Sequence, residues 1–242
     1  MINQRYNELG QPIGLPVLDW TAPPLPDHTP LAGRYCRLEG LAVAHHAADL
    51  LAAYSLDHTG AMWTYLGYGP FQDLAAIETW LASVEHSTDP LFYAIIDLAS
   101  GKAVGHISYL RITPSAGSIE VGHVVYSPLL QRARVATEAM YLLMQRAFTL
   151  GYRRYEWKCD ALNAPSRRAA QRYGFSYEGI FRQALVYKGR NRDTAWYACI
   201  DQEWPALDAA YQCWLDPSNF DDQGQQRQRL SDLTAPILTL RG

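Results

Sequence analysis

Residues 120–138 read EVGHVVYSPLLQRARVATE, which is a strand, a short loop and the start of a helix in immediate succession. The loop brings free backbone N–H groups to a helix N-terminus, where the helix dipole adds partial positive charge. Arg132 and Arg134 stand at the same end. Together these features predict a binding site for a diphosphate group. The alternative is a solvated helix end with ordinary surface arginines, and these residues alone leave both interpretations open.

The charge of the chain is unevenly distributed around this stretch. The net charge is −3, yet residues 131–192 carry 13 Lys and Arg against 4 Asp and Glu, a surplus of nine positive charges. The rest of the chain carries 8 basic and 20 acidic residues. A basic segment in an acidic chain favours a polyanionic ligand of limited size. Because the acidic remainder would repel an extended phosphate backbone, we expect no nucleic-acid partner.

The overall composition is that of a globular protein. The chain has 242 residues, of which 48% are hydrophobic and 19% charged, so one domain with terminal extensions is expected. No run approaches the roughly 18 apolar residues of a membrane helix, and residues 1–10 lack the apolar core of a secretion signal. The 4 cysteines lie far apart without a CxxC pair. We therefore expect a cytoplasmic protein with no metal site and no membrane partner.

Outward from residues 120–138, hydrophobic periodicity predicts the remaining elements. Strands are predicted at residues 33–39, 92–97, 103–112, 118–126, 155–159, 175–179, 181–187 and 194–200. Helices are predicted at residues 44–54, 73–84 and 135–150, from Asn163 to Gly174, and along residues 204–214. This order predicts an α/β (α+β) fold with helices on both faces of the sheet. The helix between residues 126 and 155 makes one parallel βαβ crossover.

The chain is expected to divide into three parts. Residues 1–30 are rich in proline and predict an extended arm that lies on the core. Residues 31–205 hold the periodic elements and form the main domain. Residues 206–242 supply a C-terminal helix and a polar, glutamine-rich tail, loosely held, that packs on the same domain or extends from it.

Several motifs resemble those of the GNAT N-acetyltransferases. The run Gln131–Ala136 is in frame with the Q/R-x-x-G-x-G/A loop of that family. Residues 163–168, followed by Tyr173-Gly174-Phe175 and Glu178-Gly179, are similar to its N-x-x-S-x-R…G-F…E-G ending. Residues 62–71, MWTYLGYGPF, resemble the acceptor-side loop of the RimJ/RimL-type branch, which is similar to ribosomal-protein N-terminal acetyltransferases. The resemblance runs from about residue 31 to residue 204.

This resemblance implies a GNAT-type mixed, mostly antiparallel sheet and the use of acetyl-CoA. The acceptor would be a primary amine that reacts directly in a ternary complex, and no metal is implied. A backbone N–H near Val124 would bind the thioester oxygen, and Ser166 would hydrogen-bond the leaving thiolate or simply cap its helix. The residues implied in cofactor binding are Val124, Val125, Tyr126, Gln131, Arg132, Ala133, Arg134, Val135, Ala136, Thr137, Asn163, Ser166 and Arg168.

Glu120 and His123 are the candidates for the general base that deprotonates the amine. They stand three residues apart in a strand, so their side chains would point to opposite faces unless a bulge intervenes. Histidine titrates near neutral pH and is a natural base. Structural roles for both residues, with a water chain as the base, are the alternative. Trp63 and Tyr65 are expected near the acceptor.

The chain also departs from the GNAT motifs. Arg134 and Ala136 stand at the two motif glycines, Ala170 where many members have a tyrosine general acid, and Leu185 where some relatives place an acid. The first hypothesis is thus an N-acetyltransferase that acts on a protein N-terminus or a small amine. The second is a catalytically weak CoA-binding or sensing module, and the third a structural or interaction protein. The acceptor and a homodimer through the final helix or tail are left open.

Overall fold

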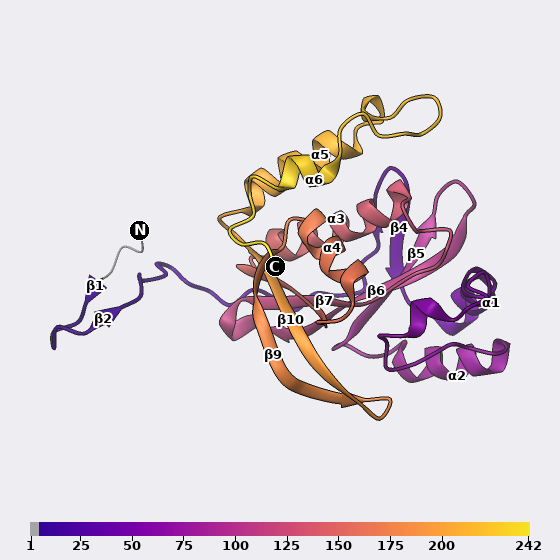
Figure 1. The fold of residues 1–242 in the computed structure, drawn as a ribbon, viewed down its shortest axis with the longest axis horizontal. Coiled ribbons are helices and arrows are strands. Elements are labelled where there is room, and N and C mark those ends of the chain that lie inside the picture. The colour runs from indigo at the N-terminus through magenta and orange to yellow at the C-terminus, as the bar shows by residue number, and fades with distance from the viewer. Residues whose placement is uncertain (1–4) are drawn as a thin grey trace.

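The computed structural model describes residues 5–242, and its centre is an eight-stranded sheet (Figure 1). The strands lie in the order β3-β4-β5-β6-β7-β8-β10-β9. They are β3 (Leu31–Ala32), β4 (Cys36–Gly40), β5 (Leu91–Asp97), β6 (Lys102–Thr113), β7 (Ser118–Tyr126), β8 (Arg154–Asp160), β9 (Ser176–Tyr187) and β10 (Arg190–Ile200). Within these residues β7 and β8 are the one parallel pair. The predicted mixed, mostly antiparallel sheet is confirmed.

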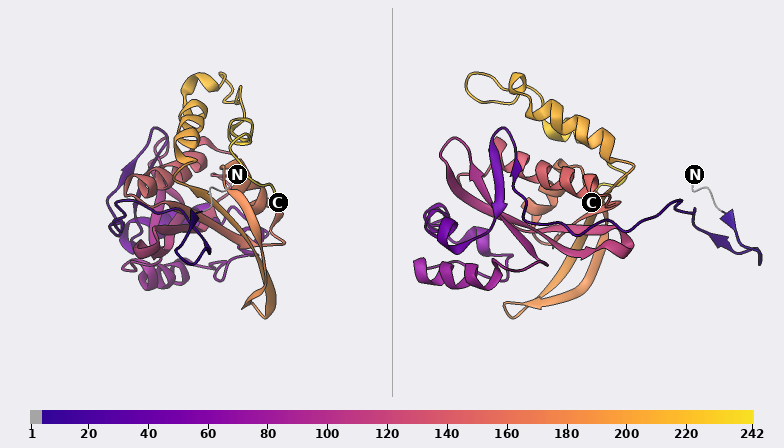
Figure 2. Two further views of the ribbon diagram at one scale, coloured as in Figure 1. Left: turned by 90° about the vertical axis from the view of Figure 1, so that its left-hand side faces the viewer. Right: turned by 180° about the vertical axis from the view of Figure 1, so that it is seen from behind.

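Helices cover both faces of this sheet, as Figures 1 and 2 show. Helices α1 and α2 pack on one face over β5 and β6, and α3, α4 and α5 lie on the opposite face. The helices are α1 (Val43–Tyr54), α2 (Leu74–Val84), α3 (Arg134–Thr149), α4 (Ala164–Arg172), α5 (Trp204–Leu215) and α6 (Leu230–Thr234). Short 3-10 turns are η1 (Ala61–Trp63), η2 (Pro114–Ala116) and η3 (Pro217–Asn219). The five predicted helices are confirmed to within two residues at each end.

Strand β5 shows how the sheet separates two hydrophobic cores. All residues from Leu91 to Ile96 are buried. Leu91, Tyr93 and Ile95 belong to the core under α3 and α5, whereas Phe92, Ala94 and Ile96 belong to the core under α1 and α2. Side chains alternate along a strand, so a strand covered on both faces reads as a continuous apolar run.

Strands β7 and β8 stay together over only part of their length. Residues 118–121 of β7 pair with residues 154–157 of β8, and no pairing continues beyond Val121 and Trp157 in the described residues. The carboxyl half of β7 therefore presents an edge without a ladder partner on the β8 side. Helix α3 begins directly beyond this divergence, after the loop of residues 127–133.

A β-bulge interrupts β7 at the same place. His106 pairs with Val125 and Ser108 with Gly122, so two residues of β7, His123 and Val124, oppose one residue of β6. His123 has φ of 47°, in the left-handed region. One extra residue reverses the alternation of side chains beyond it. The sequence predicts opposite faces for Glu120 and His123 unless a bulge lies between them, and such a bulge is present.

A buried carboxylate ties the start of the sheet to α3. Glu138 accepts hydrogen bonds from the backbone N–H groups of Arg34, Tyr35 and Cys36 at 2.7, 2.6 and 2.7 Å. A Cβ on Gly33 would lie 2.4 Å from the Glu138 carboxyl group, so a larger residue there would displace this carboxylate from its three donors. This anchor fixes Tyr35 beside the beginning of α3.

Two predicted features differ in the structure. The strands predicted at residues 175–179 and 181–187 are one strand, β9, because β10 pairs along nearly all of it. The tail after residue 215, predicted to be loosely held, is anchored at a few buried positions, although residues 221–229 between them are exposed. Asn219 is buried, its amide donates to the carbonyls of Trp214 and Gln228, and Leu230 and Thr234 of α6 are also buried.

The N-terminal arm is only partly laid on the core. Pro24 and Asp27 accept hydrogen bonds from the hydroxyls of Tyr152 and Tyr93. Residues 5–18, which include the small hairpin of β1 (Arg5–Tyr6) and β2 (Pro12–Ile13), project from the body (Figures 1 and 2). None of the helices within residues 5–242 has the length and apolar character that crossing a bilayer requires.

Candidate active site

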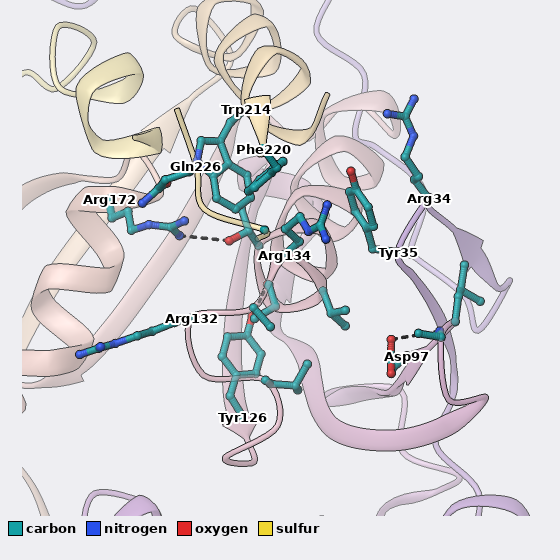
Figure 3. A pocket seen from close by; sticks show the side chains of 18 of the residues that line it. Arg34, Tyr35, Asp97, Tyr126, Arg132, Arg134, Arg172, Trp214, Phe220 and Gln226 are labelled. Atoms are coloured by element: carbon teal, nitrogen blue, oxygen red, sulfur yellow. Dashed lines mark hydrogen bonds between the residues drawn. The ribbon is translucent and has the colours of Figure 1, made fainter. Parts of the chain in front are cut away.

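A cavity of about 1060 Å³ opens at the beginning of α3 (Figure 3). Five segments that are distant in sequence form its walls: the β3–β4 turn, the β5–β6 turn, the loop into α3, α4 and the C-terminal segment. The lining residues are Arg34, Tyr35, Asp97, Leu98, Ala99, Tyr126, Leu130, Arg132, Ala133, Arg134, Val135, Ala136, Thr137, Ala169, Arg172, Tyr173, Trp214, Phe220, Gly224, Gln225 and Gln226. The loop predicted from sequence thus lines this cavity.

The first turn of α3 is uncapped where it meets this cavity. Its N-cap residue is Ala133, with extended backbone angles and no side-chain hydrogen bond to the helix, and the first turn contains no acidic residue. The N–H groups of the first turn have no acceptor within the helix itself. These donors and the positive end of the helix dipole are therefore available to an anion.

The charge of the cavity wall has the same sign as the helix end. Arg34, Arg132, Arg134 and Arg172 line it, against Asp97 as the one acidic lining residue in the described part of the chain. Figure 3 shows these arginines arriving from different sides. Guanidinium groups along a cavity wall raise the local concentration of an anionic ligand and can donate hydrogen bonds to phosphate oxygens.

Arg134 is directed away from the helix terminus. Its guanidinium carbon lies 4.9 Å from the centre of the Tyr35 ring and 4.6 Å from that of the Phe220 ring. Cation–π contacts on two sides hold the side chain against these rings. Ala136 is buried, and its carbonyl accepts a 3.0 Å hydrogen bond from the Tyr126 hydroxyl.

Glu120 and His123 share one face of the sheet. Val121 packs in the core under α3, so Glu120 lies on the opposite face. Beyond the bulge, His123 lies on this second face as well, against Tyr68 and Phe92, with ring centroids 5.6 and 5.0 Å apart. The expectation that the two residues point to opposite faces does not hold in the presence of the bulge.

Glu120 is buried within a group of cations. Its carboxylate lies 2.8 Å from Lys158 Nζ and 3.3 Å from Arg111 Nε. Burial raises the pKa of Glu120, while the hydrogen bond from Lys158 and the charge of Arg111 partly oppose that change. Lys158 is itself buried and also contacts Glu156 at 2.8 Å. The carboxylate is held in an ion-pair network.

His123 is held in its neutral form. Burial, with a smaller contribution from the charge of Arg111, lowers the pKa of His123 to about 4. The imidazole is thus uncharged at neutral pH and keeps a lone pair for accepting a proton. Its low pKa makes it a weak base, whose conjugate acid gives up its proton readily.

Ser166 stands at the first turn of α4. Its backbone N–H donates to the Asn163 side chain at 3.1 Å, so Asn163 caps the helix. Its hydroxyl oxygen accepts from the indole N–H of Trp157 at 3.1 Å. Because the oxygen is the acceptor in that bond, the hydroxyl hydrogen is left to donate to another group. Cys159 lies nearby, and burial raises the pKa of its thiol, which disfavours a nucleophilic thiolate.

Comparison with known proteins shows the family of the chain. Residues 37–176 match the acetyltransferase (GNAT) domain, which is more than half of the chain. The chain belongs to the GNAT acetyltransferase family. The superfamily expected from the motifs is thereby confirmed.

Relatives of known structure extend the similarity beyond that domain. The crystal structure of a GCN5-related N-acetyltransferase from Brucella melitensis is 49% identical, has a TM-score of 0.88, and the match covers 90% of this chain and 100% of that chain. A probable GNAT-family acetyltransferase from Chromobacterium violaceum is 40% identical, with a TM-score of 0.75 and coverage of 81% and 98%. RimL, a ribosomal L7/L12 α-N-protein acetyltransferase, shares the fold at 19% identity and a TM-score of 0.61.

Among curated proteins, the uncharacterized N-acetyltransferase YnaD of Bacillus subtilis is 26% identical over 102 residues, or 42% of this chain. The match spans 59% of the length of that relative. The assignment to the RimJ/RimL-type branch stays a prediction.

Two residues that depart from the GNAT motifs, Ala170 and Leu185, have no titratable side chain of their own. Ala170 is fully buried in α4, so its methyl group fills core space. Leu185 is 46% exposed on β9 and pairs with Arg192 of β10. Neither side chain can transfer a proton.

The structure separates the predicted cofactor residues into two groups. Tyr126 and the run from Arg132 to Thr137 line the cavity. Outside it are Val125, buried in the core under α1 and α2, and Gln131 and Arg168, both exposed. Val124, Asn163 and Ser166 also lie outside the cavity lining, around the divergence of β7 and β8.

The aromatic loop of residues 62–71 is hydrogen-bonded to two neighbouring segments. Lys188 in the β9–β10 turn donates to the Trp63 carbonyl at 2.8 Å, and the Tyr65 hydroxyl donates to the Leu162 carbonyl at 3.3 Å. Trp63 is only 2% exposed and packs edge-on against Tyr54. Trp63 therefore supports the loop from inside, and Tyr65 is the more accessible of the two residues predicted near the acceptor.

Sequence reasoning missed a buried polar cluster beneath this loop. His106 is fully buried, and its two ring nitrogens contact the hydroxyls of Tyr54 at 2.6 Å and Tyr68 at 2.9 Å. Tyr68 in turn stacks on His123. The GNAT motifs give no signal for His106, because its partners come from α1 and the aromatic loop, 52 and 38 positions away.

Proposed function

We propose that the protein transfers an acetyl group from acetyl-CoA to a primary amine by direct attack in a ternary complex. The observation that carries this proposal is the uncapped first turn of α3, which faces a basic cavity next to the divergence of β7 and β8. The backbone N–H groups of residues 134–136 and the side chain of Arg132 would hold the diphosphate.

The residues around the divergence fit the rest of the coenzyme. The unpaired edge of β7 beyond Val121 offers hydrogen-bonding groups to the extended pantetheine arm, and Val124 N–H is the proposed donor to the thioester oxygen. Asn163 orients the first turn of α4, which carries Ser166. Val125, Gln131 and Arg168 lie outside the cavity lining, so they would contribute to coenzyme binding without lining the cavity. When bound, acetyl-CoA supplies the activated acyl group.

The acceptor must lose a proton before or during attack. An alkylammonium has a pKa of about 10.4, whereas an N-terminal amine has one of about 7.7–8.0 and needs less help. His123 is proposed to relay the proton, directly or through water, because its imidazole is neutral at pH 7 and, as a weak base, passes the proton on to solvent readily. Glu120 is the less suitable base, because its carboxylate is ion-paired with Lys158 and Arg111.

The remaining step is departure of the thiolate. As the new C–N bond forms and the C–S bond breaks, negative charge moves to sulfur. The Ser166 hydroxyl, with its oxygen bound to the Trp157 indole, is the proposed donor to that sulfur. With Ala170 in the place of a tyrosine acid, this donor stabilises the thiolate by hydrogen bonding.

The first test concerns the diphosphate site. Arg132→Glu should weaken CoA binding by at least about tenfold, since it places a negative charge at the uncapped helix end. Arg146→Glu, in the last turn of the same helix, is the matched control and should leave binding within about twofold. Isothermal titration calorimetry with CoA measures both. Equal losses in the two variants would contradict the assignment.

A second candidate function is a catalytically weak CoA-binding or sensing module. The buried methyl group of Ala170 and the apolar Leu185 favour it, because two proton-transfer positions of the family are lost. Acetyl-CoA consumption in the presence of small amines, amino acids and peptides with free N-termini separates the two candidates. Turnover with any of them supports the enzyme, and binding without turnover supports the sensor.

Several finer assignments belong to the same proposal. Residues 31–205 would be the acyltransferase domain, with residues 1–30 as an arm and residues 206–242 as a C-terminal addition. The acceptor would be a protein N-terminus, as in the RimJ/RimL-type branch, or a small amine approaching past Tyr65. The protein would act in the cytoplasm, and a homodimer is compatible with the exposed apolar side chains of β9.

A further inference from the structure

The outer wall of the cavity comes from a part of the chain beyond the GNAT match. That match ends at residue 176, whereas Trp214, Phe220 and residues 224–226 line the cavity. We call residues 214–226 the C-terminal wall. In Figure 3 Trp214, Phe220 and Gln226 lie together above the start of α3, next to Arg172 from α4.

Contacts within the C-terminal wall give it a defined shape. The Trp214 indole donates to the Gln226 side-chain oxygen at 2.8 Å, and Phe220 forms a β-bridge with Gln226. Phe220 also packs edge-on against Trp214, with ring centroids 5.1 Å apart. Arg134, held between Phe220 and Tyr35, links the wall to the first turn of α3.

The groups that this wall presents are those that recognise a purine nucleotide. Phe220 is half-buried, with Arg134 over its ring, and the part of the ring that stays exposed offers an aromatic surface to a base. Gln226 accepts from Trp214 through its oxygen, which leaves its amide nitrogen to donate to a base or phosphate. Arg172 lies over the Trp214 ring at 5.1 Å and donates to Thr137, and a planar guanidinium retains further donors for phosphate.

The size of the cavity agrees with a ligand larger than a diphosphate. Ligand pockets commonly run from about 300 to 1,000 Å³, and this cavity reaches about 1060 Å³. The uncapped helix end accounts for one part of the lining, and the C-terminal wall with Arg172 bounds another. A purine nucleotide attached to the diphosphate would occupy the second part.

We infer that the C-terminal wall binds the adenosine 3′-phosphate end of the coenzyme, so that an addition outside the GNAT domain completes the donor site. This inference rests on the proposed function. The same groups would also bind a free adenine nucleotide. The experiment below distinguishes a free nucleotide from the adenosine end of the coenzyme.

The test measures the binding of CoA and 4′-phosphopantetheine to the unmodified 242-residue chain and to three variants by titration calorimetry. CoA contains the adenosine part and 4′-phosphopantetheine lacks it. Phe220→Ala removes the aromatic ring, and Gln226→Glu keeps the acceptor for Trp214 but places negative charge beside the proposed phosphate. Phe181→Ala removes an exposed ring on β9, outside the cavity, and serves as the control.

Phe220→Ala and Gln226→Glu should each weaken CoA binding about tenfold and leave 4′-phosphopantetheine binding unchanged. Phe181→Ala should change neither, and adenosine 3′,5′-bisphosphate should compete with CoA. Equal losses for both ligands, no loss for either, or binding of the bisphosphate alongside CoA would each overturn the inference and leave the proposed function standing. Failure of the unmodified chain to bind CoA would overturn the proposed function itself.

Discussion

His123 owes its place at the site to one backbone irregularity. The extra residue in β7 brings it to the face that carries Glu120, at a positive φ of 47°. Asn is among the few non-glycine residues that tolerate this conformation well. His123→Asn is therefore a substitution that removes the imidazole and retains the backbone.

The low pKa of His123 predicts a specific loss of stability in acid. The unfolded histidine takes up a proton near pH 6.5, whereas the folded one does so only near pH 4. Between these values the unfolded state binds more protons, so the free energy of unfolding falls as the pH falls. From pH 7 to pH 5, His123→Asn should lose about 2 kcal/mol less than the unmodified chain.

Urea denaturation at the two pH values measures this difference. His45 on α1 is exposed, so His45→Asn is the matched control and should behave like the unmodified chain. Identical pH dependence in the His123→Asn variant would show that this imidazole is not held neutral.

Ser166 combines a capped backbone N–H with a hydroxyl that has a hydrogen to donate. If that hydrogen stabilises the leaving thiolate, Ser166→Ala should lower kcat about tenfold and change the affinity for CoA by less than about twofold. Ser166→Thr keeps a hydroxyl and should recover most of the rate. Unchanged turnover in the alanine variant would leave Ser166 as part of the helix cap alone.

At the scale of the element, helix α3 lacks the stabilising side-chain cap that helices commonly have at the N-terminus. Ala133 occupies the N-cap position with extended angles, φ −87° and ψ 153°, where Ser, Thr, Asp and Asn are preferred. An N-cap side chain would occupy the N–H groups that the coenzyme is proposed to bind. The missing cap is therefore an expected consequence of the proposed function.

Ala133→Asp should consequently change stability and binding in opposite directions. The new carboxylate caps the helix and should raise the free energy of unfolding by about 0.5–2 kcal/mol. It should weaken CoA binding by at least about tenfold, because it competes for the same donors and repels the diphosphate. Ala133→Asn caps without charge and should weaken binding less. Thermal melts measure the stability and titration calorimetry the affinity for CoA. A rise in both stability and affinity would contradict the prediction.

Elements with strong local signals were predicted well. Gly151 and Gly174 end α3 and α4 with positive φ of 97° and 89°, as expected of C′ glycines. Asp73 and Asn163 cap their helices. The single strand β9 was predicted as two, because Gly179 reads as a break in a local window, whereas pairing with β10 decides its continuity.

At the scale of the whole molecule, the two termini differ in how they contact the domain. The side chains of Tyr6, Leu9, Ile13 and Leu18 are exposed on the projecting arm, whereas Leu230 of α6 is fully buried. A terminal segment with few contacts contributes little to the free energy of unfolding.

Deleting residues 1–18 should therefore leave the melting temperature within about 2 °C. Leu230→Ala should lower the free energy of unfolding by about 2–5 kcal/mol, because it opens a cavity under the C-terminal segment. Differential scanning calorimetry on the two variants checks both values. A large destabilisation on removing the arm would show that its exposed apolar residues are covered, for instance by a second copy of the chain.

The sequence by itself determined which segments become helices and strands, and where the uncapped turn that begins α3 lies. Apolar periodicity, caps and glycines act over a few residues, so they can be read from residues 120–138 and their surroundings without knowledge of the fold. The resemblance to the GNAT motifs, rather than these local signals, implied Tyr126 and the run from Arg132 to Thr137, which line the cavity.

Only the tertiary structure decided on which face of the sheet His123 lies and which C-terminal residues form the outer wall of the cavity. The bulge depends on pairing between β6 and β7, and the contact of Arg134 with Phe220 joins residues 86 positions apart. Such contacts form because burial brings distant segments together, and their energy depends on that packing rather than on local propensity. No local pattern in the sequence specifies them.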